Sequence, residues 1–184
     1  MDELLLVLSC KRHELLNHIQ VISGYMQLNK PEKAKEYLTK VADQLVTEGK
    51  ICHCKSEPVA VALLTVQAQT ILGGIDLPIE VEANLTSSQV ADATLVKIIE
   101  AYGAFLQHYS QSTDQLITAG WMLGLQEKPK GYYWQFAIPA DYSWRQTFID
   151  QVGQIIEAAG VKELCEVYPG DTGVHLFTPK TDVG

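Results

Sequence analysis

The sequence lacks an apolar run long enough to cross a bilayer, and it lacks a basic N-terminal region. Its first apolar run, residues 4–8, holds only Leu and Val and follows Asp2 and Glu3. A signal peptide begins with positive charge, and a membrane-spanning helix needs about 20 apolar residues. We therefore expect a cytoplasmic protein with no membrane association.

Positive charge is also scarce. The chain has 14 Lys and Arg against 22 Asp and Glu, for a net charge of −8 and a pI near 5.0. Nucleic-acid-binding domains are basic, so this class of partner is excluded. The imbalance lies in residues 57–184, which carry six basic and fifteen acidic side chains, whereas residues 1–56 carry eight and seven. Only the first segment, with a net charge of +1, does not repel anions.

Cysteines are few and show no disulfide framework. The four are Cys10, Cys52, Cys54 and Cys165, which fit reduced thiols in a cytosolic protein. Cys52, His53 and Cys54 together offer two or three metal ligands. A structural zinc site usually takes four, and no second suitable cluster follows. We favour a plain helix end here, with metal binding as the alternative.

The chain does have a long helical segment near its start. Residues 12–26 contain no proline and one glycine, Gly24. At about 100° per residue, six apolar side chains fall within roughly 60° of one another: Leu4, Leu8, Leu15, Ile19, Ile22 and Met26. His13 lies roughly opposite, on a face of small or polar residues. An imidazole in this position is available to a large docking partner.

Two helices are predicted in the N-terminal segment, residues 1–56. The first covers about residues 2–28 and ends at Asn29-Lys30-Pro31, and the second covers about residues 31–54. The apolar face of the second consists of Ala34, Leu38, Val41, Leu45 and Val46. A short antiparallel hairpin cannot cover both apolar faces alone. We expect two copies to form a four-helix bundle; the alternative is packing on the C-terminal half.

Ser56-Glu57-Pro58 separates this hairpin domain, residues 1–56, from a second domain, residues 57–184. The predicted elements of the second domain are a helix at 59–72, a strand at 77–85, a helix at 89–111 capped by Ser88, strands at 115–126 and 132–139, a helix capped by Ser143 and ended by Gly160, and strands at 163–168 and 174–178. The fold class is α+β. We expect a mixed or mostly antiparallel sheet covered on one face by helices.

The polar positions of the first helix resemble the phosphoacceptor helix of the sporulation initiation phosphotransferase B family, which is related to citrate-sensor type histidine kinases. They read Arg12-His13-Glu14-x-x-Asn17-His18-x-Gln20-x-Ile22-x-Gly24. The family pattern is Arg-His-Asp-x-x-Asn followed by Leu-Gln-x-Ile-x-Gly, so Glu14 replaces an Asp and keeps the carboxylate. The resemblance implies a dimeric bundle in which His13 accepts the phosphoryl group.

Three neighbours of His13 are candidates for supporting roles, each with a plainer alternative. Arg12 could steady the phosphoryl charge or only solvate the helix. Glu14 could orient the imidazole or accept its proton, or be a surface acid. Asn17, one turn on, could bond the ring or the phosphoryl group of the partner.

Three further residues are candidate docking contacts, and one histidine is not a candidate. Lys11, Gln20 and Gly24 are predicted to meet the partner, Gly24 because its small size lets a partner backbone approach. His18 lies about 140° from His13, toward the bundle, and is interpreted as structural.

The order of elements after residue 57 resembles the ATP-binding domain of histidine kinases, but the chemistry of that domain is missing. The domain needs an asparagine on its second helix, and the only asparagines here are Asn17, Asn29 and Asn84. It also needs Asp-x-Gly-x-Gly after the first strand hairpin, and no glycine occurs between Tyr132 and Gln151. We interpret this half as a degenerate ATPase-like domain that binds no ATP.

The sequence therefore favours a phosphotransferase that relays a phosphoryl group between aspartates of two response regulators through His13. The resemblance implies a sporulation phosphorelay. Such a protein needs no cofactor of its own, because the partner receiver domain supplies magnesium. One alternative is a non-catalytic dimeric regulator that sequesters a receiver domain or a kinase. Another, an autophosphorylating sensor kinase, is disfavoured by the missing ATP motifs.

Overall fold

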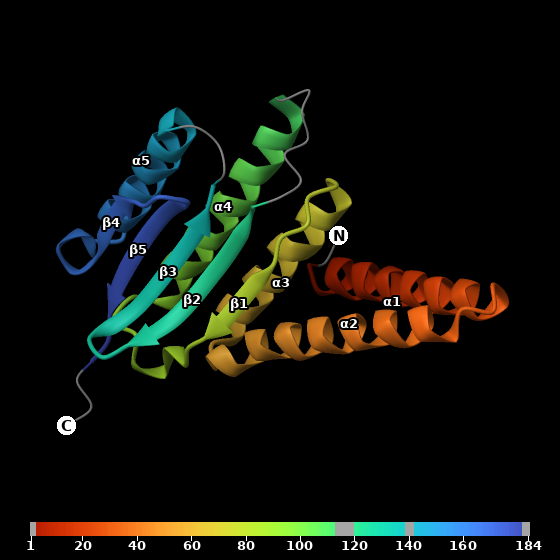
Figure 1. Cartoon of the computed structure of the whole chain (residues 1–184). Helices are drawn as coiled ribbons and strands as arrows, with labels where there is room; N and C mark the ends of the chain where they lie inside the picture. The colour runs from red at the N-terminus through yellow and green to blue at the C-terminus, as the bar shows by residue number, and fades with distance from the viewer. Residues whose placement is uncertain (1–2, 113–119, 139–141, 182–184) are drawn as a thin grey trace.

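A computed structural model describes residues 3–112, 120–138 and 142–181 of the chain. A helical hairpin projects from the side of an α/β domain, beside the sheet edge formed by its first strand (Figure 1). The order of the main elements is two helices followed by α-β-α-β-β-α-β-β, as predicted. None of the helices in the described part of the chain combines the length and apolar character that crossing a bilayer requires.

The hairpin consists of α1, Glu3–Gln27, and α2, Pro31–Gly49. Asn29 adopts a positive φ of 54° between them, which turns the chain back within a few residues. The second helix is shorter than predicted, because residues 50–54 tighten into the 3₁₀ helix η1, Lys50–Cys54. Lys55 then leaves η1 with a φ of 54°. This sharp exit redirects the chain into the second domain.

The second domain begins with α3, Glu57–Leu72. Ser56 caps it, since its hydroxyl oxygen accepts a hydrogen bond from the backbone N–H of Val59 at 3.4 Å. Gly73 and Gly74 follow the last helical residue, and Gly74 has a φ of +79° that ends the helix. The predicted helix ending at the glycine pair is therefore confirmed.

The sheet has five strands in the order β1-β2-β3-β5-β4. Their bounds are Ile79–Glu82, Met122–Lys128, Gly131–Ala137, Glu166–Pro169 and Gly173–Pro179 for β1 to β5. Only β1 and β2 are parallel, and the other neighbours are antiparallel, so the sheet is mixed. Helices α3, α4 (Asp92–Ser112) and α5 (Tyr142–Ala158) lie behind one face of the sheet (Figure 1).

The core fills the space between this sheet and its three helices. Tyr102, Trp134, Phe136 and Phe148 are all buried, and the ring of Tyr102 packs against both phenylalanines. The Tyr102 hydroxyl donates to the carbonyl of Ala137 at 2.6 Å, which satisfies its polar atom inside the core. Burial raises the pKa of this phenol, so it stays protonated.

Several predicted boundaries were wrong, and local hydrogen bonding explains two of them. Ser88 does not cap a helix at residue 89: its hydroxyl bonds to the backbone of Val90, and α4 begins only at Asp92. Residues 162–164 form a 3₁₀ turn, η3 (Lys162–Leu164), so β4 starts at Glu166. Ser143 lies inside α5 rather than before it.

Other predicted ends fall partly outside the described residues. The strand predicted from residue 115 is seen from Met122, and residues 113–119 are not described. The strand predicted to reach residue 139 ends at Ala137. A second 3₁₀ segment, η2 (Leu85–Ser87), takes the last residue of the strand predicted over 77–85. These shifts leave the order of elements unchanged.

The junction between the two parts is packed rather than free. Ile51 and Cys54 of η1 are completely buried in the core of the α/β domain. Burial raises the pKa of the Cys54 thiol, and its Sγ donates to the carbonyl of Ser56. The segment before the predicted boundary at residue 56 thus anchors the hairpin to the second domain.

Candidate functional site

His13 lies in the middle of α1 with its ring exposed to solvent. Asn17 is one turn further on, and its Nδ2 atom lies 3.2 Å from His13 Nδ1. This is the contact that i, i+4 spacing on a helix allows. The prediction that His13 is exposed is confirmed, and Asn17 is the residue that the structure brings to its ring.

The contact with Asn17 affects which nitrogen of the His13 ring carries the proton and which keeps an available lone pair. The amide oxygen and nitrogen of Asn17 exchange places when the group turns over, so either can face Nδ1. With Oδ1 there, it accepts from Nδ1–H, and the lone pair of Nε2 is left available. With Nδ2 there, the ring proton is on Nε2. A single hydrogen bond can therefore select the tautomer.

Glu14 points away from His13, into the seam between the two helices. Its carboxylate accepts from Gln44 Nε2 at 2.6 Å and pairs with Lys11 Nζ at 3.2 Å. The same Lys11 ammonium lies 2.6 Å from Glu48 of α2. These contacts tie α1 to α2. The predicted role of Glu14 at the imidazole and that of Lys11 in docking stay predictions, and both side chains are engaged here in the hairpin.

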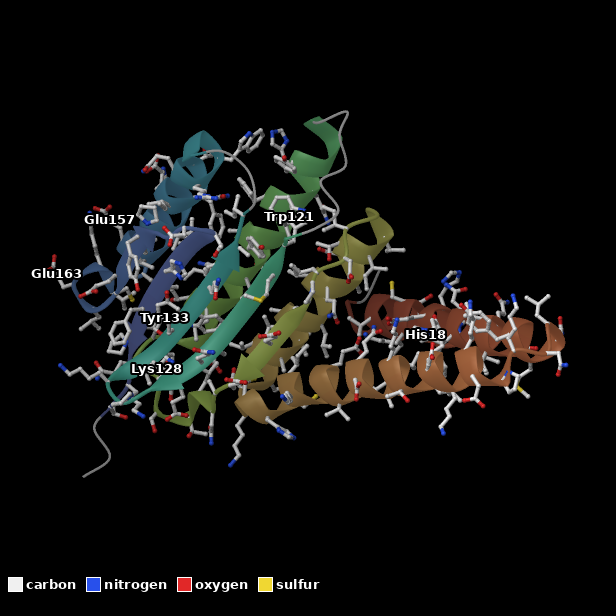
Figure 2. All side chains as sticks on the ribbon, in the orientation of Figure 1. His18, Trp121, Lys128, Tyr133, Glu157 and Glu163 are labelled. Atoms are coloured by element: carbon white, nitrogen blue, oxygen red, sulfur yellow. The ribbon has the colours of Figure 1, made fainter. Side chains whose placement is uncertain are left out.

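His18 is part of the same seam, where α1 meets α2 (Figure 2). Its Nδ1 is 3.0 Å from the hydroxyl of Tyr37, and the Tyr37 ring also contacts that of Tyr25. Glu14 Oε1 lies 3.9 Å from His18 Nε2. The interpretation of His18 as a structural residue agrees with this environment.

The remaining predicted residues lie along α1 at the surface. Gln20 is exposed, and a side chain at Gly24 would meet nothing within 4 Å, so both leave room for a partner. On a helical wheel they stand within about 20° of His13. Arg12 is also exposed, about 100° from His13, and forms no ion pair among the described residues. Their roles stay predictions.

His13 stands at a shallow recess that sequence reasoning did not anticipate. The recess has a volume of about 230 Å³ and is lined on the α1 side by Ser9, Cys10, His13, Glu14 and Asn17. Its other wall is the end of α3, at Ile71 and Leu72. No local signal in α1 could reveal this wall, because residues almost 60 positions away along the chain form it.

The apolar stripe of α1 is uncovered in the single chain. Leu8, Leu15, Ile19 and Met26 are each more than half exposed. Ile22 is only partly buried. On α2, Leu38 and Leu45 are 50% and 54% exposed, and Val46 is 66% exposed. A two-helix hairpin thus leaves a large apolar surface in water, which in soluble proteins marks an interaction site.

Except for Val46, these exposed side chains share one face of the hairpin. In α1 they lie about 90° around the helix from the side that meets α2, and in α2 Leu38 and Leu45 lie roughly 70° from the side that meets α1. Val46 lies on the far side of α2 and lines a separate hollow with Val81 of β1. Because the helices are antiparallel, the two rotations run in opposite senses and reach the same face. His13 and the end of α3 lie on the other face.

The second domain holds a different cluster on the uncovered face of its sheet. His175 is stacked between Tyr133 and Tyr168, with ring centroids 5.2 and 5.5 Å apart, and its Nδ1 is 2.5 Å from the Tyr133 hydroxyl. Burial lowers the pKa of His175 and raises that of Tyr133 to about 12. Figure 2 shows Tyr133 on the sheet, far from the hairpin. The cluster supports the sheet, as expected for a satisfied histidine.

Two sequence features of the second domain underlie the prediction that it binds no ATP. Helix α4 contains no asparagine, and the segment after β3 contains no glycine before Gly153. Residues 139–141 of that segment lie outside the described part. Cys52 and His53 are exposed while Cys54 is buried, and no three metal-ligating side chains gather anywhere in the described residues.

Comparison with known proteins identifies the helical part. Residues 1–54 match the family model described as "Sensor kinase SpoOB-type, alpha-helical domain". The N-terminal part of the chain is therefore a SpoOB-type helical domain. No curated protein sequence matches the chain. The family match covers the hairpin and η1, and it ends where the α/β domain begins.

Proposed function

We propose that this protein is a dimeric histidine phosphotransferase that carries a phosphoryl group between aspartates of two response regulators in a sporulation-type phosphorelay. The observation that carries the proposal is His13, an exposed imidazole bonded to Asn17 on a helix of SpoOB type. The SpoOB-type domain supports a phosphorelay phosphotransferase and receiver-domain partners as the general class. The resemblance of the α1 motif supports the sporulation relay in particular.

The chemistry needs an activated donor, which a receiver's aspartyl phosphate provides. His13 Nε2 attacks the phosphorus, the new N–P bond forms, and the P–O bond to aspartate breaks to release a carboxylate. The ring gains positive charge as it attacks. Oδ1 of Asn17, accepting from Nδ1–H, stabilises that charge and keeps Nε2 unprotonated beforehand. The reverse sequence delivers the group to a second receiver.

No cofactor belongs to the protein in this scheme. The magnesium ion of the receiver neutralises the phosphoryl oxygens, and the phosphotransferase supplies the nucleophile in line and a surface that positions the partner. Arg12 adds positive charge near the reacting group. Gln20 and Gly24 meet the receiver along α1, and Lys11 joins them when its ammonium leaves Glu14 and Glu48.

The dimer follows from the uncovered apolar face. A second copy is the occupant that fits it, because the face runs along both helices and a two-fold axis would bring the same apolar patch of each copy together. Two hairpins joined there form a four-helix bundle. The His13 residues then stand outside the seam, where receivers can reach them.

The second domain resembles a kinase ATPase domain that has lost its nucleotide chemistry. We assign it a structural and docking role and no ATP binding. Two features support this: α4 lacks the asparagine that would hold magnesium and triphosphate, and residues 57–184 carry a net charge of −9. An excess of that size repels a nucleotide.

Transfer from a radiolabelled phospho-receiver tests the proposal. The wild-type protein should take up label, His13→Gln should take up none, and His18→Gln should keep the activity because its ring belongs to the seam. Circular dichroism and light scattering would show that both variants fold and assemble. A wild-type protein that binds the receiver but is never labelled would contradict the proposal and favour sequestration of the receiver instead.

A further inference from the structure

The recess beside His13 has one wall that belongs to the other domain. We propose that this wall, the exposed end of α3 at Ile71 and Leu72, is an apolar docking shelf for the receiver that exchanges phosphoryl groups with His13. The inference rests on the proposed function and adds to it a specific contact from the second domain. It also states what the partner must present, namely an apolar side chain next to its phosphorylated aspartate.

The shelf is exposed although the helix that carries it is mostly buried. Val59, Leu63 and Val66 of α3 are at most 2% exposed and belong to the core, whereas Ile71 is 40% and Leu72 67% exposed. Gly73 and Gly74 end the helix directly after them. The α/β core therefore does not explain why two large apolar side chains occupy these positions.

A second copy of the chain does not cover the shelf either. The apolar faces of α1 and α2 lie on one side of the hairpin, and the recess with His13 and α3 lies on the other. A dimer built on the apolar faces leaves Leu72 in solvent. The shelf remains open to a different partner.

The receiver is that partner because the geometry brings it there. Ile71 and Leu72 line the same recess of about 230 Å³ as His13. A protein whose aspartyl phosphate is in line with the His13 ring must occupy the space directly in front of this wall. Contact between the receiver and the shelf therefore accompanies the reaction.

The composition of the docking face shows why such a shelf is needed. From Ser9 to Gln27, the side chains of α1 within roughly 40° of His13 are polar: Ser9, Asn17, Gln20 and Gln27. Stable interfaces usually have an apolar centre surrounded by polar contacts. Ile71 and Leu72 supply large apolar side chains directly at the nucleophile.

The test compares two phosphoryl donors on the full-length protein. Phosphoramidate is small and phosphorylates histidine without a docking surface. Because the chain has five histidines, the label is mapped to His13, with His13→Gln as the blank. The labelled receiver reports on docking as well. Leu72→Asp should lower kcat/KM for transfer from the receiver by at least about tenfold, the effect of losing one central apolar contact, and leave labelling by phosphoramidate unchanged. Leu72→Met should restore transfer.

Leu164→Asp is the matched control. It introduces the same charge at an exposed leucine of the same domain, 44% exposed on η3. Its neighbour Glu163 lies at the end of the domain away from the hairpin (Figure 2). This variant should transfer like the wild type.

The possible failures are distinct. Leu72→Asp with normal transfer from the receiver would overturn the shelf alone, because the wild type and variant would both still relay. Loss of phosphoramidate labelling in Leu72→Asp would also overturn it, by showing that the residue supports His13 rather than docking. A wild-type protein labelled by neither donor would overturn the proposed function, and the shelf with it.

Discussion

At the scale of single residues, the proposed site is a histidine with one hydrogen-bonded neighbour on an exposed helix face. This simplicity suits the proposed relay, because a donor that is already activated leaves little beyond positioning to be supplied. The distance of 3.2 Å between His13 Nδ1 and the Asn17 amide places Asn17 where one hydrogen bond can select the ring's tautomer and orientation. Its role can be separated from that of the nucleophile.

Asn17→Ala should slow transfer from the receiver by about tenfold. This is the effect on the rate of losing one hydrogen bond that strengthens as the ring gains charge. NMR of nitrogen-labelled histidine should show the Nδ1–H tautomer of His13 in the wild type and a mixture in the variant. Dimerisation should be unchanged, because Asn17 is exposed and outside both seams. A variant with wild-type rates and tautomer would show that Asn17 has no part in the reaction.

The sequence could predict the face on which His13 lies, because helical periodicity alone fixes it. It could not predict the partners of Glu14. Whether that carboxylate turns to His13 or to Gln44 depends on which side of α1 packs against α2, which is a tertiary property. The position of Leu72 beside His13 could not be predicted for the same reason, because only the fold brings the end of α3 to His13.

At the scale of elements, the hairpin is held by polar contacts and a few buried apolar side chains, and most of its large apolar residues stay exposed. Lys11, Glu14, Gln44 and Glu48 join α1 to α2, and Ala34 and Val41 of α2 are buried, while Ile19 and Leu45 point into solvent. Partly exposed ion pairs add little stability. The hairpin therefore needs a second apolar layer.

Ile19→Asp should dissociate the dimer, because an unpaired carboxylate in an apolar seam loses its hydration without gaining a partner. We expect the dissociation constant to rise at least about 100-fold, equivalent to roughly 3 kcal/mol. Light scattering over a concentration series measures it. Gln20→Asp adds the same charge on the His13 face and should leave the dimer intact. A wild-type protein that stays monomeric at micromolar concentration would refute the proposed bundle.

The sheet should show a pH response that originates at His175. Burial between Tyr133 and Tyr168 lowers the pKa of this histidine below 6.5, while Asp171 opposes the shift. The unfolded chain then binds more protons than the folded one just below pH 6.5, so stability falls as the pH drops from that value through the folded pKa. The urea concentration at the midpoint of unfolding should decrease as the pH is lowered from 7 to 5. In His175→Gln this decrease should be smaller. An unchanged slope in the variant would assign the effect to other groups.

The order of elements could be predicted from the sequence, but several ends could not. Ser88 looks like a helix cap by its residue type, yet its hydroxyl closes a turn with Val90 instead. Residues 50–54 fit a helical pattern, but burying Ile51 and Cys54 together in the α/β core requires a tighter 3₁₀ geometry. The local secondary-structure preference of a segment does not decide its conformation where tertiary packing stabilises another one.

At the scale of the whole molecule, the two parts of the chain differ in charge. The nearly neutral hairpin holds His13, the proposed nucleophile, and the acidic α/β domain anchors it through η1 and contributes the wall at Ile71 and Leu72. A histidine kinase of related plan would use such a second domain to deliver ATP to its histidine. The proposed lack of ATP binding concerns the entire domain and can be tested directly.

Calorimetric titration with magnesium-ATP should give no binding heat at micromolar protein, and incubation with labelled ATP alone should leave His13 unlabelled. The first reason is chemical: neither α4 nor the segment between Tyr132 and Gln151 offers the asparagine or glycines that would hold the triphosphate and adenine. The second is electrostatic, because residues 57–184 have a net charge of −9, which opposes an anionic ligand. A catalytically active histidine kinase domain measured in the same buffer serves as the positive control. Micromolar affinity for this protein would contradict the degenerate-domain assignment, and labelling from ATP would make His13 the acceptor of a kinase rather than of a relay.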